Sequence, residues 1–254
     1  MDKELAKNLQ PGEFLIGDFT SAQLFSKIEK RPIIEKPNRK VTTSEVDFRS
    51  GSILFDSQSY SNTEMVLELF FEAKTEEERD LRRDLITFAF DTGRYQTFVP
   101  YFDKKKIYMV HTISAPKFEG YTVNGNSERY TVTLTVKPFK VLINNEEVEV
   151  KNGGKVINQS LYPSLPIIKI EGKGDVNLKV NGKSFILKDI QESIVIDSGI
   201  PTVYRIPSPG EYAVNEERKA YTRQFPSLVS GSNTISWTGT LVTRVIINPR
   251  WWSL

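Results

Sequence analysis

Alternation of apolar and acidic side chains marks the segment Thr63–Ala73 as the clearest strand of the chain. Apolar residues occupy one set of alternate positions, namely Met65, Leu67, Leu69 and Phe71. Carboxylates occupy three of the intervening positions, namely Glu64, Glu68 and Glu72. Because successive side chains of a strand point to opposite faces, this pattern predicts a strand with one buried face and one exposed face.

The spacing of apolar residues changes over Glu76–Asp91, which predicts a single α-helix. Thr75 and Glu78 have the spacing of a capping box, in which the two side chains satisfy amides at the start of the helix. Acidic residues crowd the first turn, where the helix dipole favours negative charge. The residues predicted to face the core recur at helical spacing and are Leu81, Leu85 and Phe88, with Ile86 and Ala89 widening the apolar stripe.

After the helix the chain returns to strands, so the predicted fold class is mainly β. A second alternating strand contains Tyr130, Val132, Leu134 and Val136, and Pro138 ends it. Asparagine and glycine then cluster over 144–154, so we place the domain boundary near there, with one domain over 1–140 and another over 141–254. Short strands with frequent turn signals follow, which indicates a β-sandwich.

Two features of the second half support that reading. Asn181-Gly182 separates two apolar runs, 176–180 and 184–187, and suits the turn of a β-hairpin. Trp237 lies in the strand-like run 234–237 and is predicted to be a buried core residue.

The segment Lys30–Thr43 is predicted to be an exposed arm. It is charged and contains prolines, which remove ladder donors and disfavour a central strand. If laid on the sheet edge of a neighbouring copy, it would supply one patch of a head-to-tail interface. A mobile loop is the alternative interpretation. The candidate interface residues are Lys30, Arg31, Pro32, Ile33, Ile34, Pro37, Arg39 and Val41.

Charge and composition exclude several classes of function. The chain has 34 Lys and Arg against 32 Asp and Glu, so it lacks the basic excess that binding to nucleic acid requires. It has no cysteine, which excludes disulfides and thiolate chemistry. The first residues do not form a secretory signal, and no apolar stretch is long enough to insert in a membrane.

Catalytic chemistry finds little support, and no cofactor or metal is expected. His111 is the single histidine, so any Ser-His-Asp triad would depend on it, and it lies in a strand-like run. The carboxylates of the alternating strand most simply face solvent rather than forming the pair of a glycoside hydrolase. We therefore predict a protein that is not an enzyme, with a tail hydrolase as a remote alternative.

The order of motifs in the second half is similar to that of a known family. The motifs are Ser164-Leu165-Pro166-Ile167-Ile168-Lys169-Ile170, Gly172-Lys173-Gly174-Asp175-Val176, Asn181-Gly182-Lys183-Ser184-Phe185, Ile194-Val195-Ile196-Asp197-Ser198, Phe225-Pro226-Ser227-Leu228, Gly231-Ser232-Asn233-Thr234-Ile235-Ser236-Trp237 and Pro249-Arg250-Trp251-Trp252. Together with the single helix and the strand ending Val136-Lys137-Pro138-Phe139, they resemble the distal tail proteins of siphophages that infect Gram-positive bacteria. The resemblance covers nearly the whole chain.

That resemblance implies a structural role in the virion. The N-terminal domain, with its helix and arm, would join copies into a hexameric ring, either single or stacked back to back in isolation. A galectin-like sandwich would lie at the periphery. The partners would be the tail tube protein, a tail-tip protein, and receptor-binding or baseplate proteins. DNA would pass through the hole without specific binding. The protein would be made in the host cytoplasm and reside at the tail tip.

The alternative function is a carbohydrate-binding tail module that contacts the host cell wall. Galectins bind sugar through a histidine-containing cluster and a stacking tryptophan followed, three positions later, by glutamate. Here the second half has no histidine, and Thr240 stands three positions after Trp237. The resemblance to galectins therefore predicts a fold without the sugar site.

Overall fold

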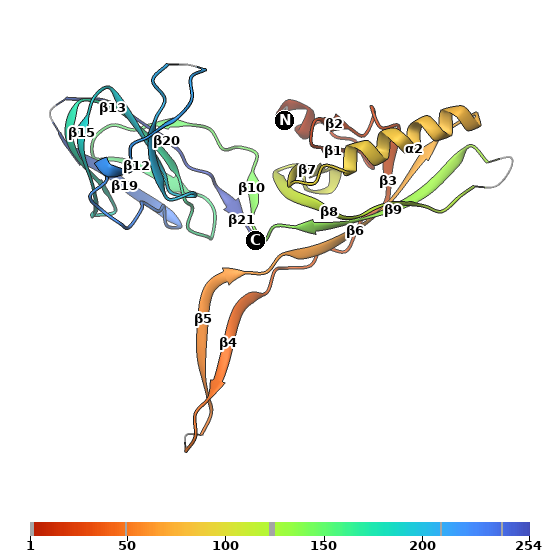
Figure 1. The fold of residues 1–254 in the computed structure, drawn as a ribbon, viewed down its shortest axis with the longest axis horizontal. Helices are drawn as coiled ribbons and strands as arrows, with labels where there is room; N and C mark the ends of the chain where they lie inside the picture. The colour runs from red at the N-terminus through yellow and green to blue at the C-terminus, as the bar shows by residue number, and fades with distance from the viewer. Residues whose placement is uncertain (1–2, 49, 122–124, 209, 240) are drawn as a thin grey trace. The chain divides into compact units, whose positions relative to one another are not determined.

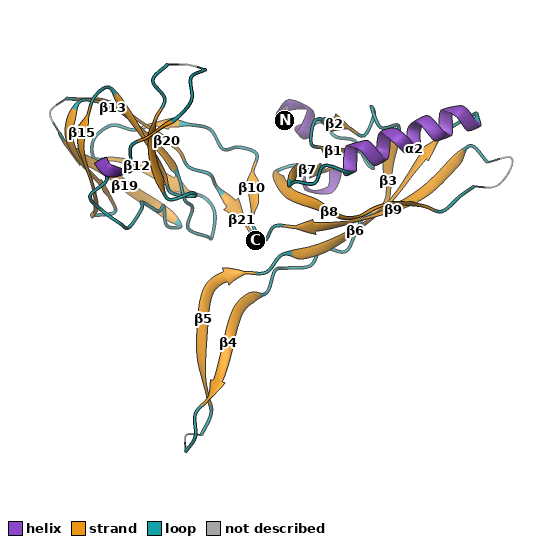
Figure 2. Ribbon diagram, viewed as in Figure 1, coloured by secondary structure: helices purple, strands orange, loops and turns teal. Residues whose placement is uncertain are grey.

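The computed structural model describes residues 3–48, 50–121, 125–208, 210–239 and 241–254, and it is mainly β (Figures 1 and 2). The chain divides into two compact units. Unit 1 comprises Met1–Ile143 with Leu254, and unit 2 comprises Asn144–Ser253. Among the described residues, no helix combines the length and the apolar character needed to cross a membrane.

Unit 1 is built on an antiparallel sheet with the strand order β2-β1-β7-β8-β9-β6-β3, and β10 also pairs with β8. The bounds are β1 Phe14–Ile16, β2 Phe19–Thr20, β3 Ser26–Lys30, β6 Thr63–Glu72, β7 Gln96–Pro100, β8 Lys106–Phe118, β9 Ser127–Val136 and β10 Lys140–Leu142. A short helix α1, Lys3–Lys7, precedes them, and a 3-10 turn, Tyr101–Asp103, follows β7. The pattern of the sequence did not predict α1, which has a single buried residue, Ala6.

The two predicted alternating strands are confirmed, and they pair along their whole length. Register joins Met65 to Leu134 and Leu69 to Tyr130, so the apolar faces of β6 and β9 coincide. These side chains are buried, and the carboxylates Glu64, Glu68 and Glu72 are exposed. Period-two patterning thus produces one continuous core face.

The predicted helix is confirmed as α2, Glu76–Phe90. The Thr75 hydroxyl accepts a hydrogen bond from the Glu78 amide at 3.2 Å, which is half of the expected capping box. The Glu78 carboxylate accepts from the Lys74 amide at 2.7 Å, one residue before the amide that a capping box would use. α2 packs on the sheet through Ile86, Ala89 and Phe90, which belong to the main core.

The prediction that Leu81 and Phe88 face the core is wrong. Their side chains are 69% and 70% exposed, and only Leu85 packs partly against the core. The buried face follows Arg79, Ile86 and Phe90, almost opposite Leu81 and Phe88 around the helix. Arg79 sits in that face because it pairs with buried Glu128. The predicted stripe correctly included Ile86 and Ala89, but a pattern of apolar residues could not assign Arg79 to the buried face.

Between β3 and β6 the chain makes a separate two-stranded hairpin. Its strands are β4, Arg39–Glu45, and β5, Ser52–Tyr60. In Figure 1 the hairpin projects away from α2 and from the sheet of unit 1. Every residue of β4 is exposed, and in β5 only Ile53 and Tyr60 are partly covered.

Unit 2 has the two antiparallel sheets of a β-sandwich, with the orders β11-β20-β13-β16-β17-β18 and β12-β19-β14-β15. The bounds are β11 Val148–Glu149, β12 Gly154–Asn158, β13 Ile167–Gly172, β14 Gly174–Val180, β15 Lys183–Ile190, β16 Ser193–Asp197, β17 Thr202–Arg205, β18 Val214–Asn215, β19 Gly231–Thr238, β20 Val242–Asn248 and β21 Trp252–Ser253. A 3-10 turn spans Glu217–Lys219. The predicted hairpin is confirmed, because Val180 pairs with Lys183 across Asn181 and Gly182.

Trp237 departs from its predicted full burial and is only partly covered. It follows the buried residues Asn233 and Ile235 on the inward side of β19. However, β12 begins at Gly154, opposite Ile235, so no residue of that strand flanks Trp237. The Asn152 side chain takes the place of a neighbouring strand at this position. It donates to the carbonyl of Trp237 at 2.8 Å and accepts from its amide at 2.9 Å.

Candidate assembly surface

The predicted arm, Lys30–Thr43, divides into two parts. The first packs on the body of unit 1, and the second belongs to the projecting hairpin. Lys30 is the last residue of β3, and residues 31–38 form an irregular stretch along the body of unit 1. Ile34 packs partly against the main core, Pro37 is buried, and Pro32 is partly covered. The Arg31 guanidinium lies 5.1 Å from the ring centre of Phe102, whereas Ile33 is 84% exposed. The stretch is therefore largely held on its own subunit.

Arg39 and Val41 belong instead to the hairpin, whose base is locked. The Arg39 guanidinium donates to both carboxylate oxygens of Asp56 and, at 3.1 Å, to the Tyr60 hydroxyl. These hydrogen bonds raise the pKa of Arg39 and lower the pKa of Asp56. Just outside the strands, the Ser61 amide donates to the Asn38 carbonyl at 2.9 Å. The hairpin thus leaves the body at a defined point.

Beyond its base, the hairpin exposes apolar side chains on both of its faces. Direct pairing joins Thr43 to Leu54 and Thr42 to Phe55, so Leu54 and Phe55 point to opposite faces. Leu54 is 65% exposed and Phe55 is 56% exposed. A two-stranded hairpin is marginal in water on its own, and apolar groups on both faces indicate contact with another molecule. We define this hairpin, residues 39–60, as the assembly hairpin.

Sequence reasoning missed the second strand of the assembly hairpin. The predicted arm ends at Thr43, although residues 44–55 mix strand-forming residues with the turn-like run Ser50-Gly51-Ser52. The polar residues Asp56, Ser57, Gln58 and Ser59 interrupt any apolar alternation in β5. The available signal was the short apolar run Ile53-Leu54-Phe55 just after a glycine turn.

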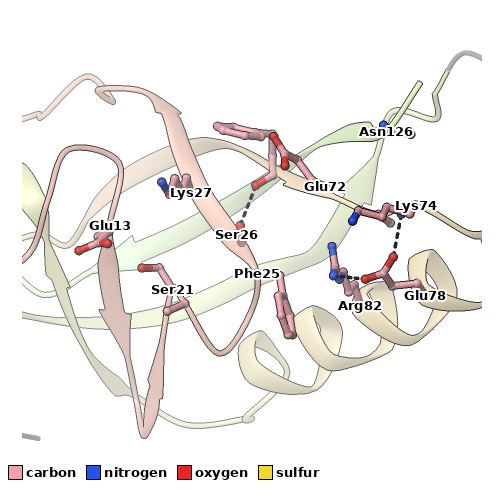
Figure 3. A pocket seen from close by; sticks show the side chains of 13 residues that line it. Glu13, Ser21, Phe25, Ser26, Lys27, Glu72, Lys74, Glu78, Arg82 and Asn126 are labelled. Carbon is pink, nitrogen blue, oxygen red and sulfur yellow. Dashed lines mark hydrogen bonds and ion pairs between the residues drawn. The ribbon is translucent and has the colours of Figure 1, made fainter. Parts of the chain in front are cut away.

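A cavity of about 410 Å³ lies beside the first half of α2 (Figure 3). Phe25, with a positive φ of 52° and 54% exposure, forms part of its wall, and the Arg82 guanidinium lies 4.3 Å from the centre of that ring. Arg82 also pairs with Glu78, whose pKa is lowered chiefly by the hydrogen bond from the Lys74 amide. The charged lining residues are Glu13, Lys27, Glu72, Lys74, Glu78 and Arg82.

The Ser26 hydroxyl in this cavity makes structural hydrogen bonds rather than those of an activated nucleophile. Ser26 Oγ is 2.6 Å from the Tyr130 hydroxyl and 3.2 Å from the Phe70 carbonyl oxygen. No histidine lines the cavity, and acids and bases balance along its wall. The cavity therefore carries neither an activated nucleophile nor a strong charge.

The other residues that the sequence suggested for catalysis do not lie together in one site. His111 is partly covered on β8, and its ring lies 6.0 Å from that of Tyr95. The carboxylates Glu64, Glu68 and Glu72 occupy the exposed face of β6. Within the described ranges, no group of three or more His, Cys, Asp or Glu residues could hold a metal ion. Thr240, which bears on the galectin comparison, lies outside the described residues.

A buried ionic cluster fixes α2 to β9. The Glu128 carboxylate accepts from the Arg83 guanidinium at 2.7 Å and lies 3.5 Å from Arg79 Nη1. Both the Glu128 and Arg79 side chains are almost fully buried. Hydrogen bonding to Glu128 raises the pKa of Arg83. Arg79 also donates from Nη2 to the Gly125 carbonyl at 3.0 Å, so the cluster ties α2 both to β9 and to residue 125, which precedes β9.

No family model and no curated protein sequence matches the chain. Solved structures, in contrast, do match the chain. The chain is similar to the Dit protein of phage SPP1, described as a hub of the adsorption apparatus in phages that infect Gram-positive bacteria. The TM-score is 0.73 at 10% identity, over 96% of this chain and 100% of that one.

Two structures of the phage p2 baseplate in its activated conformation, with strontium and with calcium, are also similar. Their TM-scores are 0.54 and 0.52 at 11% identity, and in both cases 94% of this chain matches 97% of theirs. At these identities the likeness establishes a fold rather than an activity. The resemblance to distal tail proteins is thus confirmed as a structural one: this chain has the fold of phage hub and baseplate proteins.

Proposed function

We propose that this chain is a structural subunit of a phage tail, a distal tail protein whose copies close into a hexameric ring. The observation that carries the proposal is the full-length match to a hub protein, which spans both units and leaves none of that protein unmatched. The exposed assembly hairpin supports it, because a ring needs a surface by which one copy reaches the next.

The ring would join the tail tube protein on one side to a tail-tip protein on the other, and receptor-binding or baseplate proteins would attach at its periphery. This gives the chain a place at the end of the virion tail and no catalytic duty.

Passage of DNA through the ring is the second part of the proposal. The side of β6 and β9 that faces away from the core carries carboxylates and Val66 on β6, and the threonines Thr131, Thr133 and Thr135 with Arg129 on β9. Phosphates gain affinity from lysine and arginine contacts, but Arg129 is paired with Glu29, so this face would let DNA slide without being held. The balanced charge of the whole chain points the same way.

Electron microscopy and light scattering on the purified chain test the proposal. The expected result is a ring with a central hole and the mass of a hexamer, or of two hexamers stacked back to back. The measurement is repeated after addition of the tail tube protein, which should bind one face of the ring. A chain that stays monomeric at high concentration, and forms no ring with tail tube protein, would rule the ring out.

A further inference from the structure

Unit 1 exposes a second apolar surface, on the outer side of α2. Leu81 and Phe88 are 69% and 70% exposed, and the spacing of Glu77, Leu81, Asp84 and Phe88 places all of them on one face of the helix. Phe88 lies edge-on to Phe19 with the ring centres 6.1 Å apart, which orients its ring. We define this surface, Glu77, Leu81, Asp84 and Phe88, as the outer helix face.

The outer helix face combines apolar groups with unpaired negative charge. Glu77 and Asp84 are exposed, and among the described residues neither carboxylate takes part in an ion pair, unlike Glu78 and Asp80. A partner that covers this face should therefore present apolar side chains together with a cation.

One face of the assembly hairpin has that composition. Thr42 pairs with Phe55, and alternation along β5 places Ile53 on the same face as this pair. The register shift between Arg39 and Val41 adds residues to β5 and not to β4, so alternation along β4 places Lys40 on that face as well. Lys40 is exposed and forms no ion pair within the described part of the chain. Arg39, in contrast, is paired with Asp56. The opposite face carries Leu54 with Glu45, an acid in no ion pair among the described residues, which the acidic outer helix face would repel; Asp56, on the same face, is paired with Arg39.

Addition of the hairpin as an extra strand to a neighbour's main sheet is disfavoured by the two ends of that sheet. β2 has only two residues. At the other end, outward amides of β3 are already used, since Ser26 donates to the Ser21 carbonyl at 2.9 Å and Ile28 to the Gly12 carbonyl at 2.8 Å. Contact through side chains is therefore favoured over contact through backbone ladders.

We propose that the Lys40–Phe55 face of the assembly hairpin in one copy docks on the outer helix face of the next copy. The inference rests on the proposed ring and names its two surfaces. A head-to-tail contact needs two different complementary patches on the same chain. The hairpin projects away from α2 of its own subunit, so the two surfaces are free to meet between copies (Figure 1).

Disulfide cross-linking tests this contact directly, because the chain contains no cysteine. The double variant Phe55→Cys with Leu81→Cys is assembled and then mildly oxidised. On a non-reducing denaturing gel it should give a ladder of covalent oligomers that ends at the hexamer. Each single variant should give no ladder. The pair Leu54→Cys with Leu81→Cys is the matched control and should cross-link poorly, since Leu54 lies on the other face.

Charge exchange provides a second, independent readout. Lys40→Glu and Asp84→Lys should each raise the concentration needed for assembly by roughly tenfold or more, and together they should restore much of the loss. Ile157→Asp, at a 65% exposed site in unit 2, is the control for adding charge to an exposed apolar position. Circular dichroism checks that each variant is folded.

The outcomes separate this inference from the proposed function. If the unmodified chain forms no ring, the ring itself is wrong. If it does form rings, but the Phe55–Leu81 pair gives no ladder and charge exchange gives no rescue, the ring stands and this contact is overturned.

Discussion

Asp197, at the end of β16, shows how one buried charge organises a corner of unit 2. Its carboxylate accepts from the Gly199 and Ile200 amides at 2.8 and 3.1 Å, and from Arg250 Nη1 and Nη2 at 2.7 and 2.8 Å. Burial raises the pKa of Asp197, but Arg250 and the two amides outweigh it and leave the pKa below its ordinary value. A Cβ on Gly199 would lie 2.4 Å from Arg250 Nη1, so glycine leaves room for the pair.

Replacement of Asp197 by asparagine should destabilise unit 2 by about 2 kcal/mol at neutral pH, because Arg250 loses its charged partner. The folded pKa is depressed, so the contribution of the carboxylate is fully present above its unfolded pKa of about 4. It is lost as pH falls through the lower, folded pKa. Urea unfolding of both proteins from neutral to strongly acidic pH should show the two stabilities converging in acid. An unchanged difference at low pH would contradict this account.

Buried residues could be predicted from the sequence where apolar residues recur at a regular spacing. Met65 and Tyr130 could be assigned to the core because a strand with one wet face gives strict alternation. Leu81 and Phe88 were misassigned because α2 carries apolar residues on two sides, and the side facing the core includes Arg79. Burial of that arginine depends on Glu128, which is distant in sequence, so no local pattern reveals it.

At the scale of elements, the chain is punctuated by turns whose geometry demands particular residues. Asn181 and Gly182 connect β14 to β15, and both have positive φ, 51° and 79°. Two successive left-handed residues make the turn whose twist matches a tight hairpin, which is why Asn-Gly could be read from sequence. The assembly hairpin has no Asn-Gly pair, and its weaker turn signal at Ser50-Gly51 did not by itself reveal a second strand that runs to Tyr60.

Gly182→Ala should therefore destabilise unit 2 by about 1 kcal/mol. A Cβ at Gly182 would meet no atom within 4 Å, so the whole cost comes from the backbone conformation and none from a clash. The midpoint of urea unfolding measures the effect. Lys183→Ala, at the next and exposed position, is the control and should change stability by less than about 0.5 kcal/mol. Equal midpoints for the two variants would remove the backbone argument.

For the whole molecule, the order of motifs led to the right fold, but not to the surface on which assembly depends. The start of the arm was placed near Lys30 because prolines and charge are local signals. The division at Asn38, where the chain leaves the body, depends on burial of Pro37 and partial burial of Ile34. The number of copies in a ring depends on the angle between neighbours, which is a property of two molecules.

Excision of the assembly hairpin separates folding from assembly. Because the Ser61 amide already bonds the Asn38 carbonyl, residues 39–60 can be replaced by Asn-Gly without moving the ends. Unit 1 should keep its fold, since β4 and β5 pair only with each other and add no buried residue to the core. Circular dichroism should be native-like apart from lost strand signal, while light scattering should report a monomer.

A shorter excision is the matched control for that variant. Replacing residues 46–51 by Asn-Gly removes only the segment beyond the last pair, Glu45 with Ser52, and keeps Thr42 paired with Phe55. If the body of the hairpin makes the contact between copies, this variant should still assemble, with at most a modest rise in the concentration required. Rings from the chain that lacks residues 39–60 would remove the hairpin from the contact. Loss of assembly on removal of the tip alone would move the contact to the tip and away from the face that carries Phe55.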